Sequence, residues 1–172
     1  MENAENMKTL ALMGDGESYR DTLCSMIESV PMFSDLSRPE VQLLAGYVRA
    51  YEAKKDAVIF KEGDKGMFMC IVSTGRVNIL KEGQDREQKR VATVRPGKSL
   101  GEMSLLDELP YSATAVAQED AELLLLTRMN FERLSSEQPE LCNALMRQIA
   151  RLMSLRLRQT TGVLLDYLSG DK

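Results

Sequence analysis

The spacing of apolar positions changes twice along this chain. In its first part, apolar residues such as Val41, Leu44 and Val48 recur at three- and four-residue steps, the period of an amphipathic helix. Residues 51–127 instead contain short apolar runs and two-residue alternation, which are typical of strands. From Met129 the helical period returns. The pattern therefore predicts N-terminal helices, a β-rich middle and a helical C-terminal part.

Two short helices are expected ahead of the strands. Residues 18–30 form the first, and a proline ends it. The second begins at Ser37, because Glu40 stands at the spacing that completes a capping box. Residues 1–17 are polar, so we expect a flexible N-terminal segment there, with one helical turn at Lys8–Met13.

Turn residues divide the middle of the chain into short strands. Gly75 marks one turn, residues 82–85 a hairpin, and residues 95–97 a further turn. About seven or eight strands at this spacing favour a mainly β fold, an antiparallel jelly-roll-like β-barrel (double-stranded β-helix). Six of these strands are expected at residues 57–60, 67–72, 76–80, 91–94, 112–117 and 121–126.

Pro139 opens a long helix that is expected to end near Leu168. About 30 residues without another proline give roughly 45 Å, a length that few helices of globular domains reach. The helix carries two apolar stripes, whereas packing on one domain requires one. The stripe expected to cover the barrel contains Leu141, Leu145, Leu152 and Leu155. The stripe suited to a contact between two helices contains Cys142, Met146, Ile149, Met153, Leu157, Thr160, Leu164 and Tyr167.

These patterns divide the chain into three parts. Residues 1–17 are the flexible segment, residues 18–137 the barrel domain with its short flanking helices, and residues 138–168 the long helix. We expect a homodimer through residues 138–168; the alternative is one broad stripe that packs on its own domain. Only residues 169–172 follow, so we expect no helix-turn-helix domain and no DNA binding by this chain alone.

The composition narrows the partners and compartments that fit. The chain of 172 residues is 44% hydrophobic, enough for one domain with a substantial core. Its net charge of −4 argues against nucleic acid as the main partner, because such a partner needs a basic face. No apolar run approaches the ~20 residues of a membrane span, and the N-terminus does not resemble a signal peptide. We expect a cytoplasmic protein without membrane contact, in which Cys24, Cys70 and Cys142 are buried, reduced thiols.

The chain contains no histidine. A histidine general base, a Ser-His-Asp site and the metal centres built from imidazole are therefore excluded. We expect neither enzyme activity nor a bound metal or other resident cofactor.

The most distinctive stretch, residues 101–114, reads Gly-Glu-Met-Ser-Leu-Leu-Asp-Glu-Leu-Pro-Tyr-Ser-Ala-Thr. It combines a Gly-Glu turn, a short apolar helical segment and a Pro-x-Ser-Ala-Thr strand start. Residues 59–77 add Glu-Gly-Asp at residues 62–64 and a further glycine, Gly75, at the next turn. Together with the long terminal helix, these segments resemble the cyclic-nucleotide-binding domain family, most closely its bacterial catabolite-activator branch. The resemblance covers about residues 25–168.

The resemblance identifies residues 101–114 as a phosphate-binding cassette, the name used below. It implies that Gly101 lets the backbone approach the ligand, and that Glu102 accepts hydrogen bonds from a ribose 2′-hydroxyl. The backbone amides of Met103 and Ser104 then point at the phosphate from the positive end of a short helix.

The strand start that follows completes the implied ligand-binding set. Ser112 donates its hydroxyl to a phosphate oxygen, and Ala113 lies beside it. Ser112 and Glu102 are alternatively structural, the first as a strand residue and the second as a carboxylate that organises the loop. Residues 62–64 are interpreted as a structural turn rather than a ligand contact, since glycine and aspartate supply turn geometry.

One cassette position departs from the family. The family has arginine, bidentate on the phosphate, where this chain has Tyr111. A charged hydrogen bond contributes about 1.5–3 kcal/mol, and tyrosine offers only a neutral donor. We therefore expect cyclic-nucleotide affinity to fall about tenfold to hundredfold. The alternative is that the phenol only covers apolar surface at an empty pocket, with its hydroxyl in solvent.

A second departure lies on the long helix. Counted from the cassette without gaps, the family's purine-facing positions fall on Arg156 and Leu157. Arg156 is expected either to enter the pocket and pair with Glu102 or to supply the missing positive charge. The alternative is an arginine in solvent, like others on this helix.

Three functions remain open at this point. The first is a non-enzymatic signalling module that senses a cyclic nucleotide (cAMP, cGMP or a related small anion) and changes its contacts with a protein partner. The second is an interaction or scaffold protein that kept the fold and lost the ligand. The third is the sensor part of a transcription regulator without its DNA-binding domain.

Overall fold

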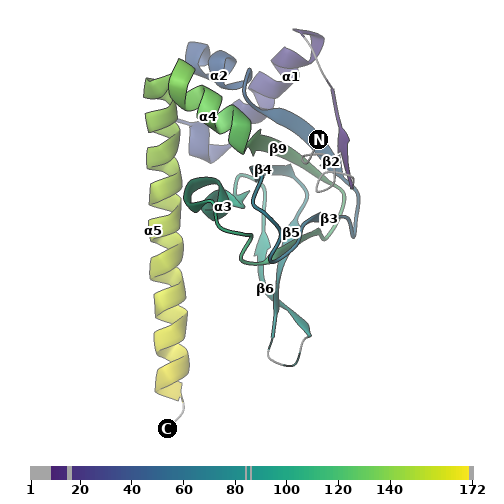
Figure 1. The fold of residues 1–172 in the computed structure, drawn as a ribbon, viewed down its shortest axis with the longest axis vertical. Coiled ribbons are helices and arrows are strands. Elements are labelled where there is room, and N and C mark those ends of the chain that lie inside the picture. The colour runs from purple at the N-terminus through teal and green to yellow at the C-terminus, as the bar shows by residue number, and fades with distance from the viewer. Residues whose placement is uncertain (1–8, 15–16, 84, 86, 171–172) are drawn as a thin grey trace.

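The computed structural model describes residues 9–14, 17–83, 85 and 87–170. In this part of the chain, antiparallel strands form two sheets, short helices cover one end, and a long helix runs along the side (Figure 1). The strands are β1 (Leu10–Leu12), β2 (Arg49–Ala53), β3 (Val58–Phe60), β4 (Phe68–Thr74), β5 (Val77–Glu82), β6 (Gln88–Val94), β7 (Ser99–Leu100), β8 (Thr114–Ala117) and β9 (Ala121–Thr127). The helices are α1 (Glu17–Glu28), the 3-10 helix η2 (Pro31–Phe33), α2 (Arg38–Leu44), α3 (Glu102–Asp107), α4 (Arg128–Glu137) and α5 (Pro139–Gly170).

The strand order confirms the predicted antiparallel β fold with N-terminal helices and a long C-terminal helix. One sheet has the order β1-β2-β9-β4-β7 and the other the order β3-β8-β5-β6, and the described pairs are antiparallel. The β5–β6 hairpin pairs Glu82 with Gln88, as the predicted turn requires. Glu40 accepts a hydrogen bond of 2.7 Å from the Ser37 backbone amide, so the predicted capping box at the start of α2 is present.

The central strands β4 and β9 are buried on both faces. Leu124 and Leu126 pack against the helices, whereas Leu123 and Leu125 pack between the two sheets. This double burial explains the unbroken leucine run, since alternate strand residues point to opposite faces. We call the two resulting clusters the helix-side core and the inter-sheet core. The helix-side core includes Ile27, Val30, Phe33, Val41, Leu44, Met69, Ile71, Leu134 and Leu145, and the inter-sheet core includes Ile59, Phe60, Phe68, Cys70, Val77, Leu100 and Tyr111.

The N-terminal segment differs from the expectation. Leu10–Leu12 is a strand, not part of a helical turn, and pairs antiparallel with β2, with Leu10 opposite Ala53. The free edge of β2 offers backbone partners, and Leu10 is buried in the inter-sheet core. Residues 1–8 and 15–16 lie outside the described residues, so the rest of the flexible-segment prediction stays untested. The short strands β2 and β7 were also not expected.

The long helix α5 uses its apolar stripes differently along its length. Leu141 and Leu145 lie in the helix-side core as expected, but so do Cys142 and Ile149, which the sequence assigned to the two-helix contact. The first half of that stripe therefore packs on the chain's own domain. Residues 157–169 are all exposed, and this half of the helix extends past the body of the domain (Figure 1). No helix within the described residues is long and apolar enough to cross a membrane.

Candidate functional site

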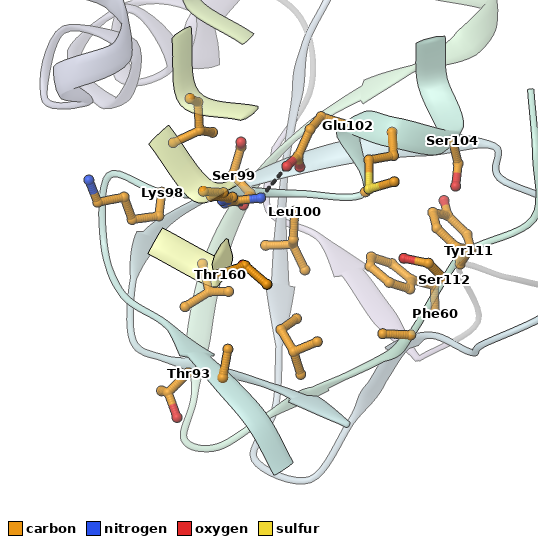
Figure 2. Close-up of a pocket in the computed structure, with 18 of the residues that line it drawn as sticks. Phe60, Thr93, Lys98, Ser99, Leu100, Glu102, Ser104, Tyr111, Ser112 and Thr160 are labelled. Carbon is orange, nitrogen blue, oxygen red and sulfur yellow. Dashed lines mark hydrogen bonds and ion pairs between the residues drawn. The ribbon is translucent and has the colours of Figure 1, made fainter. Parts of the chain in front are cut away.

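A cavity of about 480 Å³ opens between the cassette, the strands of the second sheet and α5 (Figure 2). The structure brings all the sequence-predicted site residues to its wall: Gly101, Glu102, Met103, Ser104, Tyr111, Ser112, Ala113 and Arg156. They come from the β7–α3 junction, the segment just before β8 and one face of α5. That they bind a ligand stays a prediction.

The sequence reasoning missed part of the wall. The additional lining residues include Phe60, Ile79, Ala92, Thr93, Val94, Lys98, Ser99, Leu100, Leu152, Leu155, Gln159 and Thr160. Those on α5 recur at three- and four-residue steps from Arg156, so the helical period could have identified them. The residues from β5 and β6 carried no such signal, because their part in the cavity depends on how the two sheets pack.

Gly101 makes the turn between β7 and α3. Its φ of +77° lies in the left-handed region, and a Cβ there would come within 3.0 Å of the Phe68 carbonyl oxygen and 3.2 Å of Tyr111 Cε1. A larger residue would therefore meet both strain and crowding. Glycine allows the chain to enter α3 directly beside β4.

Glu102, the first residue of α3, is a carboxylate with only 3% of its side chain exposed. Arg156 of α5 forms an ion pair with its Oε1 and also donates a hydrogen bond to the Ser99 backbone carbonyl. The dashed line in Figure 2 marks the ion pair. Arg156 therefore pairs with Glu102, and the alternative of an arginine in solvent is wrong.

The second carboxylate oxygen of Glu102, Oε2, is buried and has no hydrogen-bond partner within the described residues. A buried carboxylate oxygen without a donor is unfavourable. Glu102 is also one of the residues that line the cavity.

Tyr111 is part of the inter-sheet core. Its side chain is 2% exposed, and its ring stacks on Phe60 with centroids 3.9 Å apart. Its hydroxyl donates to the Phe68 carbonyl oxygen at 2.8 Å and accepts from the amides of Met67 and Phe68 at 3.2 and 3.1 Å. The alternative of a hydroxyl in solvent is therefore wrong.

This bonding pattern fixes what Tyr111 can offer a ligand. A phenol has one proton to donate, and that proton is used on the Phe68 carbonyl. Burial raises the pKa of Tyr111 to about 12, so the side chain stays neutral at physiological pH. Tyr111 lines the cavity with an apolar ring edge and supplies neither charge nor a free donor.

The backbone of Tyr111 is also held. Its carbonyl accepts from the Gly63 amide and its amide donates to the Asp64 carbonyl, each at 2.9 Å. Gly63 has a φ of +84°, the geometry for which a turn glycine was expected. Lys81 bonds both Glu62 and, at 2.6 Å, the Ser112 carbonyl. These contacts support the interpretation of residues 62–64 as a structural turn.

Three charged side chains line the cavity: Lys98, Glu102 and Arg156. Lys98 lies on the far side of the cavity from Tyr111 (Figure 2). The cassette end around Tyr111 and Ser112 has no cationic side chain on the described wall. Lys81 bonds the Ser112 carbonyl at 2.6 Å but does not line the cavity, so the described wall at that end is neutral.

The described residues contain no cluster of three potential metal ligands among Cys, Asp and Glu side chains. Burial raises the pKa of the Cys70 thiol well above its usual range, so Cys70 is a protonated core residue.

The model of the family described as "Cyclic nucleotide-binding domain" matches residues 51–138. The cyclic AMP receptor protein of Thermus thermophilus is 36% identical over 142 residues, which cover 83% of this chain and 63% of that protein. The cAMP-dependent protein kinase regulatory subunit of Yarrowia lipolytica is 30% identical over 121 residues, or 70% of this chain and 32% of that protein. This chain therefore matches less than two thirds of the length of either relative.

The fold comparison agrees with the sequence comparison. A crystal structure of a cyclic nucleotide-binding domain from Methylobacillus flagellatus KT superimposes with a TM-score of 0.82 at 28% identity. The match covers 95% of this chain and 92% of that one.

The buried hydroxyl of Tyr111 predicts a stability loss in Tyr111→Phe. Removing it leaves the backbone groups of Met67 and Phe68 unpaired, which costs about 1–3 kcal/mol of unfolding free energy at pH 7. Urea denaturation measures the loss. The control is Tyr167→Phe on an exposed ring (72%), which is expected to change little.

The same residue predicts a pH dependence. Because the pKa of Tyr111 is raised from 10.0 to about 12 in the folded state, its contribution to stability is complete below pH 10 and is lost as pH rises through 12. The stability advantage of wild type over Tyr111→Phe should shrink by about 2 kcal/mol between pH 10 and 12. A constant difference across that window would contradict the burial of the hydroxyl.

Proposed function

Because the chain belongs to the cyclic nucleotide-binding domain family, we propose that it is a non-catalytic regulatory module. It senses a cyclic nucleotide, cAMP or cGMP, or a related small anionic ligand, and changes its contacts with a protein partner when the ligand binds. The proposed setting is the cytoplasm, in keeping with the three free cysteines.

The observation that carries this proposal is that Glu102 Oε2 is buried without a hydrogen-bond partner within the described residues, and that Glu102 lines a cavity large enough for a nucleotide. A buried acceptor without a donor is a cost that a ribose hydroxyl would relieve. The volume of about 480 Å³ lies in the range of small-molecule sites.

The proposed binding roles follow the cassette. Glu102 accepts from the ribose, the amides at Met103 and Ser104 face the phosphate, and Ser112 donates its hydroxyl to it. Gly101 and Ala113 permit close approach of the backbone. These assignments rest on the positions of the residues along the cavity wall.

The proposed ligand affinity is weakened at the phosphate. Tyr111 replaces the family's arginine, and its hydroxyl is bonded to the β4 backbone rather than free for a ligand. Without a charged hydrogen bond of about 1.5–3 kcal/mol, affinity falls about tenfold to hundredfold. Micromolar or weaker binding of cAMP is the consequence.

A second candidate is an interaction protein that no longer uses a ligand. The ion pair between Arg156 and Glu102 favours it, because the chain itself already supplies a countercharge to the buried carboxylate. Titration with cAMP and cGMP separates the two candidates.

The proposed assembly is a homodimer through the second half of α5. Leu157, Leu164 and Tyr167, all from the predicted two-helix stripe, are 70%, 54% and 72% exposed. Leu165 and Leu168 widen this apolar surface. An exposed apolar row of this extent on one helix is typical of an interaction site.

The ligand proposal predicts a gain of affinity in Tyr111→Arg. Isothermal titration calorimetry should give weak cAMP binding to wild type and binding about tenfold to hundredfold tighter to the variant. Tyr111→Phe is the matched control, since the hydroxyl does not reach the ligand, and its affinity should equal that of wild type. Thermal melts check that both variants fold. Equally tight binding by wild type and Tyr111→Arg would refute the role assigned to position 111.

The dimer proposal predicts that charge in the stripe separates the subunits. Sedimentation velocity should show a dimer for wild type at micromolar concentration and a monomer for the double variant Leu157→Glu/Leu164→Glu. The control is Asp166→Lys, which changes a charge on the same part of the helix but at a position outside the stripe. This variant should stay dimeric. A wild-type protein that sediments only as a monomer contradicts the proposal.

A further inference from the structure

One guanidinium from α5 holds both sides of the β7–α3 junction. Arg156 bonds the Ser99 carbonyl, which lies before Gly101, and the Glu102 carboxylate, which lies after it. The junction carries the left-handed glycine that starts the cassette. Arg156 therefore bonds the chain at the place where the ligand-binding backbone turns.

The two oxygens of the Glu102 carboxylate have different surroundings. Oε1 accepts a hydrogen bond from Arg156, whereas Oε2 is buried and has no hydrogen-bond partner within the described residues. A ligand hydroxyl can bond Oε2 while Arg156 keeps Oε1. The arginine and the ligand therefore need not compete for Glu102.

The countercharge for the Glu102 carboxylate comes from Arg156. A carboxylate that is 3% exposed needs a countercharge, and the cassette supplies none because position 111 is a neutral tyrosine. Lys98, the other cation on the described wall, is an exposed side chain on the far side of the cavity from Tyr111. The countercharge in contact with Glu102 comes from the long helix.

We propose that Arg156 is a positioning residue that makes the site selective for a ribose hydroxyl. By holding Oε1, it fixes the orientation of the Glu102 carboxylate so that Oε2 can accept a hydrogen bond from the hydroxyl of a ribose-bearing ligand. The inference rests on the proposed function and adds to it the residue that sets selectivity. It also links that selectivity to α5, the helix proposed to dimerise.

The test is a thermodynamic cycle that removes one ligand hydroxyl and one protein side chain, separately and together. The probes are cAMP and 2′-deoxy-cAMP, titrated up to 10 mM by NMR into wild type and variants. Wild type should prefer cAMP by roughly tenfold to hundredfold, the value of a hydrogen bond to a charged group. In Arg156→Gln the preference should fall to about threefold or less, because Glu102 is no longer held or neutralised.

Two further variants separate positioning from general stability. Arg156→Lys keeps the charge but cannot bond both Ser99 and Glu102 with a planar fork, so its preference should lie between wild type and Arg156→Gln. Should Arg156→Gln fail to fold, this variant alone carries the test. Arg158→Gln removes an exposed arginine from the same helix and should keep the wild-type preference.

The possible failures are distinguishable. If wild type binds neither probe nor cGMP, the assignment of a cyclic nucleotide as the ligand fails and the inference fails with it. If wild type prefers cAMP and the Arg156 variants keep the full preference, the inference alone is overturned. If wild type binds both probes equally, Glu102 does not form the proposed hydrogen bond with the 2′-hydroxyl, and the inference is again overturned.

Discussion

The ion pair between Glu102 and Arg156 is the interaction on which the rest of this site depends. It gives a buried carboxylate at the wall of the cavity a countercharge, while the second oxygen of that carboxylate has no hydrogen-bond partner within the described residues. Removing the arginine would leave a buried charge uncompensated, which is far more costly than losing a surface pair. The geometry of the cassette is thus tied to the position of α5.

The charge balance of this pocket explains how Tyr111 is tolerated. Position 111 of the cassette holds a neutral residue, and the cation in contact with Glu102 comes from α5. Tyr111 in turn became a structural residue: it stacks on Phe60, bonds the start of β4 and, through its backbone, the turn at residues 62–64. The described wall of the cavity around Tyr111 and Ser112 carries no charged side chain.

The sequence predicted the features that local patterns determine. The turn at residues 62–64, the capping box of α2 and the length of α5 follow from short-range spacing, whereas the cassette was identified by its resemblance to the family. Counting from the cassette brought Arg156 to the pocket, with the pair to Glu102 as one of the alternatives left open. The partners of the Tyr111 hydroxyl were not predictable, because Phe68 lies far away in sequence and only strand packing brings the two together. For the same reason β1 was missed, since its strand conformation depends on the edge of β2. Cys142 and Ile149 matched a two-helix stripe by period, but the helix-side core uses them.

Hydrogen–deuterium exchange with and without saturating cAMP tests the central claim most directly, namely that the pocket and α5 are joined through Glu102 and Arg156. The account predicts that ligand slows exchange at residues 99–107 and also at residues 150–161 of α5, while the exposed segment from residue 162 onward changes less. Protection confined to residues 99–107, with α5 unaffected, would contradict it.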